Sequence, residues 1–89
     1  MNWPLRRQPA PMYKITEGIP VTIEVFTDGF LVGFREGNAW GAGKTVQKAM
    51  DDFREEAVAL FEMLAEDEHE LGPGLLKELH ALAPYMEKA

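Results

Sequence analysis

The sequence predicts an α+β fold in which a three-stranded antiparallel sheet carries one long helix on one face, followed by a short C-terminal helix. Two patterns support this prediction. Residues 45–68 place apolar side chains at intervals of three or four, the period of an amphipathic helix. Residues 21–26 alternate in polarity, the period of a half-buried strand, and Asp28-Gly29 follows as a hairpin turn signal.

The predicted helix runs from Thr45 to Glu68. Thr45 suits the N-cap, because its hydroxyl can accept a hydrogen bond from an otherwise unpaired backbone N–H. The apolar positions form one stripe: Val46, Ala49, Met50, Phe53, Ala57, Leu60, Phe61 and Leu64. The opposite side is acidic: Asp51, Asp52, Glu55, Glu56 and Glu62. Such a helix cannot bury its stripe alone, so we expect its two phenylalanines to pack on the sheet.

The hairpin is expected to contain a type I′ turn at Asp28-Gly29, which would fix the register of the first two strands. The predicted pairs on the helix side are Thr27 with Phe30, Val25 with Val32, and Ile23 with Phe34. On the far side they are Phe26 with Leu31, Glu24 with Gly33, and Thr22 with Arg35. The face expected to contact the helix is apolar: Val21, Ile23, Val25, Phe30, Val32 and Phe34. After a turn at residues 36–38, residues 39–43 form a third strand that glycine makes weak in propensity.

The two ends of the chain are predicted to differ from this centre. Residues 1–19 form an extended proline-rich arm in which residues 13–15 begin a short edge strand. Residues 20–70 form the β-β-β-α domain. Residues 71–89 belong to the same domain and form a short helix after the break at residues 72–74. Its marker residues are Leu75, Leu76, Leu79, Leu82 and Met86, with Pro84 ending or straining the helix.

Composition limits the classes of function. The chain has 89 residues, 46% of them hydrophobic, and no cysteine, so we expect one domain without disulfides or zinc–thiolate sites. No apolar run is long enough to span a membrane and no signal peptide is evident, so a cytoplasmic protein is expected. The net charge is -6, and residues 45–71 carry nine acidic residues against two basic ones. This surface would repel phosphates and attract a basic partner, although a solvated helix face is the commoner explanation of such a run.

Two motifs suggest chemistry, and neither fulfils its pattern. Residues 41–45, Gly-Ala-Gly-Lys-Thr, resemble a phosphate-binding loop, but the first glycine of that motif should stand at Asn38. Glu66, His69 and Glu70 have metal-ligand spacing on a helix, but a solvated acidic helix end is the better interpretation. The chain has no serine, and its paired acids have no evident cleft. We therefore expect no catalytic site, no cofactor and no metal.

The order of these motifs resembles the HicB-type antitoxin domain over residues 20–70. The positions that match its pattern are Asp28, Gly29 and Phe30 in the hairpin, Gly43 and Thr45 before the helix, and Ala49 within it. The resemblance implies a truncated RNase H-like fold and a non-enzymatic protein that neutralises a basic, HicA-like mRNA-cleaving toxin. Residues 71–89 are too short and too poor in basic residues for the DNA-binding segment of such antitoxins, so no direct nucleic-acid binding is expected.

Self-association is the last expectation. One helix covers only one face of a sheet, and the far face would group Phe26, Leu31, Arg35 and Trp40. Grouped apolar side chains outside a core usually mark an interface. We therefore expect a homodimer or higher homo-oligomer that uses these four residues. The alternative to self-association is that the proline-rich arm covers the patch within one chain. The alternative to the antitoxin function is a stand-alone oligomeric domain with a structural or regulatory role and no toxin partner.

Overall fold

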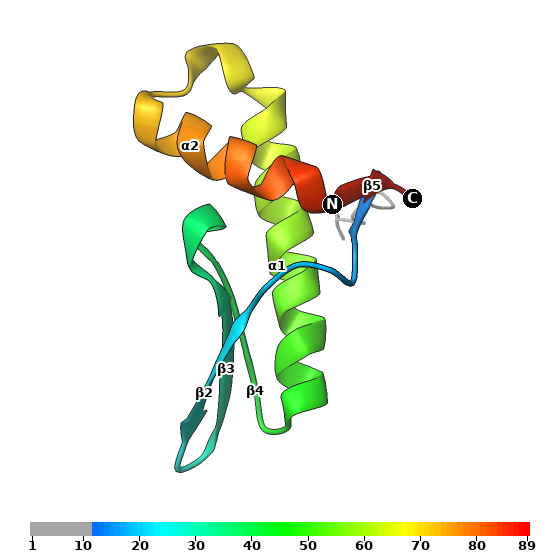
Figure 1. Cartoon of the computed structure of the whole chain (residues 1–89), viewed down its shortest axis with the longest axis vertical. Coiled ribbons are helices and arrows are strands. Elements are labelled where there is room, and N and C mark those ends of the chain that lie inside the picture. The colour runs from blue at the N-terminus through cyan, green and yellow to red at the C-terminus, as the bar shows by residue number, and fades with distance from the viewer. Residues whose placement is uncertain (1–11) are drawn as a thin grey trace, which may run out of the picture.

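Three antiparallel strands and one long helix make up the centre of the fold, as Figure 1 shows. A computed structural model describes residues 12–89. The sheet has the order β2-β3-β4, built from β2 (Thr22–Phe26), β3 (Gly29–Phe34) and β4 (Ala39–Gly43). Helix α1 (Val46–Glu66) lies on one face, and the short helix α2 (Pro73–Leu82) crosses its far end. The predicted fold class is confirmed.

A second, smaller sheet joins the two ends of the described chain. Strand β1 (Tyr13–Ile15) pairs antiparallel with β5 (Met86–Lys88), and the Ala89 N–H donates to the Met12 carbonyl at 3.0 Å. The sequence predicts the first of these strands but not the second, because it assigns Met86 to the C-terminal helix. That assignment is wrong: α2 ends at Leu82, and the 3₁₀ turn η3 (Ala83–Tyr85) contains Pro84 and leads into β5. Of the predicted arm at residues 1–19, residues 1–11 lie outside the described residues, and residues 13–15 form β1.

Helix α1 begins where the sequence predicts and ends slightly earlier. The Lys48 N–H donates to the Thr45 hydroxyl at 3.0 Å, so Thr45 is the N-cap. At the other end the Asp67 N–H donates to the Leu64 carbonyl at 3.3 Å and closes the helix. The next residues form the 3₁₀ turn η2 (Glu68–Glu70) before α2.

The pairing of β2 with β3 is shifted by two residues from the predicted register, and the turn lies one residue earlier than predicted. Phe26 pairs with Gly29, so the turn consists of Thr27 and Asp28. No glycine among the described residues has positive φ, which excludes the expected type I′ turn at Asp28-Gly29. Instead, a Cβ on Gly29 would lie 2.8 Å from the carbonyl oxygen of Gly43, so glycine is needed here for a close approach of two backbones.

The strand pairs change with the turn, while the faces do not. Ile23 pairs with Val32 and Val25 with Phe30, where the sequence predicts Phe34 and Val32 as their partners. On the far face the observed pairs are Glu24 with Leu31 and Thr22 with Gly33, so the predicted pairs Phe26 with Leu31, Glu24 with Gly33 and Thr22 with Arg35 are wrong. A shift of two residues keeps every side chain on its predicted face, because side chains alternate with a period of two. The turn between β3 and β4 is the 3₁₀ turn η1 (Arg35–Gly37), followed by Asn38 in the left-handed conformation.

The core lies between α1 and the strands β3 and β4. Its buried residues include Val32, Phe34, Ala39, Ala49, Phe53, Ala57, Phe61 and Leu64, and Leu79 and Leu82 extend it to α2. Helix α1 approaches β4 so closely that a Cβ on Gly41 would meet the backbone of Phe53 and lie 2.7 Å from the carbonyl oxygen of Ala49. A Cβ on Gly43 would lie 2.6 Å from the Ala49 nitrogen. The glycines that weaken β4 as a strand therefore allow the helix to lie directly on it.

This placement corrects one packing expectation. Phe53 is fully buried and Phe61 nearly so, as predicted. However, Ile23 and Val25 are not their cover: Ile23 is 48% exposed and Val25 is 71% exposed. Phe61 instead meets the ring of Tyr13 edge-on, with 5.1 Å between ring centres. Strand β2 is thus left outside the layer that α1 covers.

Candidate functional site

Strand β2 is the most exposed regular element of the sheet. All five of its residues are exposed, whereas β3 and β4 carry buried residues. Within residues 12–89, β2 pairs with β3 alone, so its other edge is open. Three of its five side chains are large and apolar: Ile23, Val25 and Phe26. An open edge that carries apolar side chains is a template for pairing with another chain.

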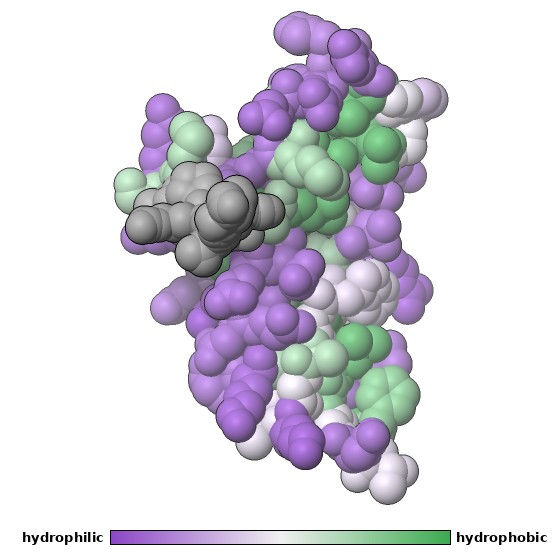
Figure 2. Space-filling view, turned by 180° about the vertical axis from the view of Figure 1, so that it is seen from behind, coloured by the Kyte–Doolittle hydropathy of each residue, from purple (hydrophilic) through white to green (hydrophobic). Residues whose placement is uncertain are grey.

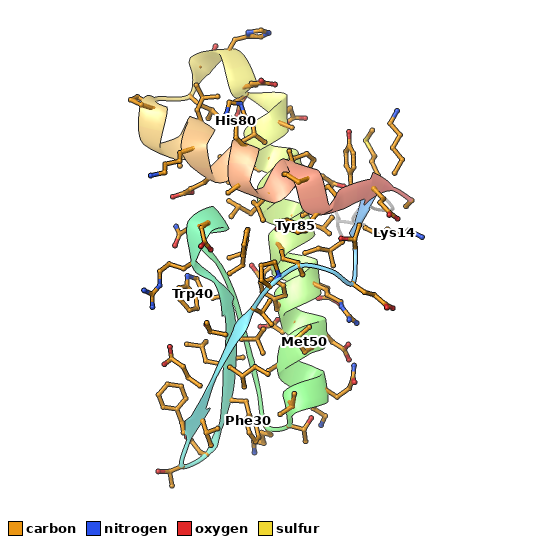
Figure 3. The ribbon with its side chains drawn as sticks, viewed as in Figure 1. Lys14, Phe30, Trp40, Met50, His80 and Tyr85 are labelled. Carbon is orange, nitrogen blue, oxygen red and sulfur yellow. The ribbon has the colours of Figure 1, made fainter. Side chains whose placement is uncertain are left out.

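The helix side of β2 belongs to a wider apolar area, here called the β2 patch: Ile23, Val25, Phe30, Val46 and Met50. Val25 and Phe30 are cross-strand partners, and Phe30 also pairs with Gly43 at the start of the turn into α1. Figure 3 shows Phe30 and Met50 in the space between the sheet and α1, and both are half-buried. Val46 is 41% exposed. Its strand residues, Ile23, Val25 and Phe30, lie on the part of the sheet's apolar face that α1 leaves least covered, and Val46 and Met50 belong to the first turns of α1.

The opposite edge of the sheet, formed by β4, has one of its backbone donors bonded by a side chain of α1. The Ala42 N–H of β4 donates to Oδ2 of Asp52 at 2.9 Å, so a side chain of α1 takes up a backbone donor on this strand. The sequence places Asp52 on the solvated side of the helix and gives it no such role. Within residues 12–89 the two edges of the sheet are therefore unequal: α1 lies over β4 and Asp52 bonds one of its N–H groups, whereas no strand pairs with the outer edge of β2.

The four residues of the predicted oligomer interface do not form one continuous row. Phe26 is 52% exposed beside the turn, and Leu31 is half-buried opposite Glu24. Trp40 lies on the side of the sheet away from α1 (Figure 3), where its ring covers Gly33 and its Nε1 donates to Oδ1 of Asn38 at 3.3 Å. Arg35 is exposed in η1 rather than on a strand.

A shallow hollow of about 350 Å³ lies at the turn end of the sheet. It is lined by Phe26, Asp28, Gly29, Phe30, Leu31, Ala42, Gly43 and Lys44. Phe26 and Leu31 thus meet at this hollow, while Trp40 and Arg35 lie elsewhere. An interface made of these four residues remains a prediction.

The acidic surface predicted on α1 divides into two groups. Oε2 of Glu62 accepts hydrogen bonds from the Met12 and Tyr13 N–H groups at 2.8 and 3.1 Å, so this residue, like Asp52, holds the fold together. The other acidic residues are exposed: Asp51, Glu55, Glu56, Glu66, Asp67, Glu68 and Glu70. Figure 2 shows hydrophilic side chains gathered along α1 and over the turn at its far end. These seven residues are called the acidic surface below.

The two sequence motifs that suggest chemistry, residues 41–45 and the acidic and histidine residues near position 68, both lie in described parts of the structure. Residues 41–45 are the junction of β4 and α1, and the glycines at 41 and 43 press against the helix backbone. The three residues with metal-ligand spacing, Glu66, His69 and Glu70, do not share a helix, because α1 ends at Glu66 and the other two lie in η2. Within residues 12–89, no three acidic or histidine side chains are grouped closely enough to hold a metal ion.

No helix in the described part of the chain has the length and apolarity needed to cross a membrane. No protein-family model, curated protein or solved structure matches this chain. Its function must therefore be inferred from its own residues.

Proposed function

We propose that this chain is a small, non-enzymatic, cytoplasmic binding protein resembling a HicB-type antitoxin, which neutralises a basic mRNA-cleaving toxin by covering its surface. The observation that carries the proposal is the acidic surface. Its seven carboxylates are exposed along α1 and η2, while the two acids that the fold uses, Asp52 and Glu62, are bonded to backbone N–H groups. The β-β-β-α order also agrees with the resemblance.

The physical basis is electrostatic complementarity. A row of like charges on a rigid helix raises the local concentration of an oppositely charged protein and speeds its association. The same charge disfavours direct contact with nucleic acid, so a toxin that binds RNA through basic residues is a better partner than RNA itself. Binding through this surface should weaken as ionic strength rises, because salt screens exposed charges.

Capture from the native host tests the proposal. The tagged chain should retain a small basic protein whose expression alone arrests growth and whose toxicity is reversed by co-expression of this chain. Changing Glu55 and Glu56 together to lysine should abolish capture and rescue, because both are exposed members of the acidic surface on α1 and the change reverses two of its charges. The matched control is the double variant Glu17→Lys with Glu36→Lys, which makes the same change in net charge at two exposed acids outside that surface.

Two results would contradict the proposal. One is that no basic protein with this toxicity is retained at low salt. The other is that the variant of Glu55 and Glu56 captures and rescues as well as the control does, which would place the contact elsewhere.

A stand-alone oligomeric domain without a toxin is the second candidate function. The open edge of β2 and its exposed apolar side chains favour it, because they suit contact with another chain whether or not a basic partner exists. An oligomer that retains no basic protein from host extract would support this second function over the first.

A further inference from the structure

We propose that β2 pairs antiparallel with β2 of a second copy of this chain, with Ile23 at the two-fold axis, so that two three-stranded sheets become one sheet of six strands. The proposal does not depend on the presence of a toxin. It also differs from the interface predicted from the sequence, because the contact is made by a strand edge rather than by the sheet face that carries Trp40.

The hairpin determines which backbone groups of β2 are free. Phe26 and Gly29 flank a two-residue turn, and such flanking residues form a hydrogen-bonded pair. Hydrogen-bonded and non-hydrogen-bonded pairs then alternate along an antiparallel ladder. Val25 and Ile23 fall in non-hydrogen-bonded pairs, so their N–H and C=O groups point away from β3. These N–H and C=O groups are available on the open edge to form hydrogen bonds with another strand.

Symmetry limits the register of a second β2 on this edge. A two-fold axis perpendicular to the sheet places residues of the same face opposite each other, so one residue of β2 must lie directly opposite its own copy, with the axis midway between the two. Centring on Glu24 would set two carboxylates directly opposite each other in a close pair, which is unfavourable. Centring on Ile23 places Glu24 opposite Thr22 of the second copy and Val21 opposite Val25. The Ile23 register therefore pairs apolar with apolar side chains and separates the acids.

Composition and charge also favour a second copy of this chain as the partner that pairs with the edge of β2. Four of the five residues from 21 to 25 are β-branched, the residue type best suited to strands, and the segment has no lysine or proline of the kind that protects natural edges. Glu24 is its only charged residue. The acidic surface lies on α1, which covers β4 at the other side of each sheet, so the two acidic surfaces stay apart.

Single cysteines introduced into this cysteine-free chain test the register directly. In the Ile23 register the two copies of residue 23 have Cα atoms about 5.5 Å apart, which a disulfide can span. The two copies of residue 24 are about 8 Å apart, which is too far. Under mild oxidation, Ile23→Cys should therefore form a covalent dimer, and Glu24→Cys should not. Efficient linking through residue 24 and not residue 23 would overturn the proposed register.

Sedimentation equilibrium of the full chain tests the interface without oxidation. The chain should be a dimer at micromolar concentration, and Ile23→Lys should make it monomeric by placing two ammonium groups at the axis. Thr22→Lys should tighten the dimer roughly threefold to tenfold, because each new lysine faces Glu24 of the other copy. Phe26→Asp, outside the paired residues, should leave the mass unchanged, and circular dichroism should show each variant folded. A monomeric native chain, or a dimer lost in Phe26→Asp but kept in Ile23→Lys, would overturn the proposal.

Discussion

Replacing Gly41 by alanine measures how closely α1 lies on β4. The new Cβ would collide with the Phe53 backbone and lie 2.7 Å from the carbonyl oxygen of Ala49. These atoms belong to the helix backbone, so no change of side-chain rotamer can relieve the contact. The whole helix would have to move away from the strand, and the buried side chains between them would lose contacts.

The expected loss of stability is large for a chain of this size. Overpacking a core costs about 1–3 kcal/mol, and we place Gly41→Ala at about 3 kcal/mol because the obstacle is backbone. Small domains have a free energy of unfolding of about 5–15 kcal/mol, so much of the total is lost. With a urea dependence of about 1.5 kcal/mol per molar, the unfolding midpoint should fall by about 2 M.

Alanine substitutions at two other glycines should give smaller losses of stability, which can be compared with that of Gly41→Ala. Gly74 lies in α2 with nothing within 4 Å of its Cβ position, so Gly74→Ala should be neutral or stabilising by up to about 1 kcal/mol. Gly33→Ala should fall between the two, because the obstacle there is the Trp40 ring, which can turn aside. If Gly41→Ala unfolds at the same urea concentration as Gly74→Ala, the close contact of α1 with β4 is refuted.

Three further outcomes are expected in urea unfolding or hydrogen exchange. Phe53→Ala should cost about 3–5 kcal/mol, whereas Val25→Ala, at an exposed position, should cost under about 1 kcal/mol; equal losses would mean that α1 covers β2 after all. Thr45→Ala should cost about 1 kcal/mol by removing the N-cap, and Thr45→Ser should restore most of it. Glu62→Gln should speed exchange of the Tyr13 amide without changing that of Phe53, and an unchanged Tyr13 would show that the carboxylate does not hold β1.

The elements that local patterns determine were predictable, and those that depend on distant contacts were not. The Thr45 cap and the two faces of the hairpin follow from side-chain chemistry and alternation, so they survive even an error in the turn. The turn itself was misassigned because Asp28-Gly29 matches a local signal, while the reason for Gly29 is its contact with Gly43, 14 residues later in the chain. Strand β5 was missed because three residues after a proline carry no periodic signal.

The candidate surfaces were likewise predictable only where local sequence patterns determine them. The exposed acids on α1 could be predicted from helix periodicity, but the structural roles of Asp52 and Glu62 could not, since their partners are backbone N–H groups elsewhere in the chain. The exposure of β2 was hidden for a similar reason. Alternation shows that Ile23 and Val25 share a face with the core residues of β3, but only the position of α1 over β4 shows that this face is left uncovered.

The hydrogen bond between Asp52 and Ala42 bears on how many strands can be added to the sheet when copies of the chain associate. A sheet with two open edges can add strands repeatedly and lengthen into a fibril. In this chain α1 lies over β4 and Asp52 takes up the Ala42 N–H on the outer edge of that strand, so the proposed pair of copies has at each end an edge with one backbone donor already bonded. We therefore expect the proposed assembly to favour two copies, with the Asp52 carboxylate hindering the addition of a further strand to β4. Asp52→Ala would free the Ala42 N–H and is expected to make this edge a better template for further strands.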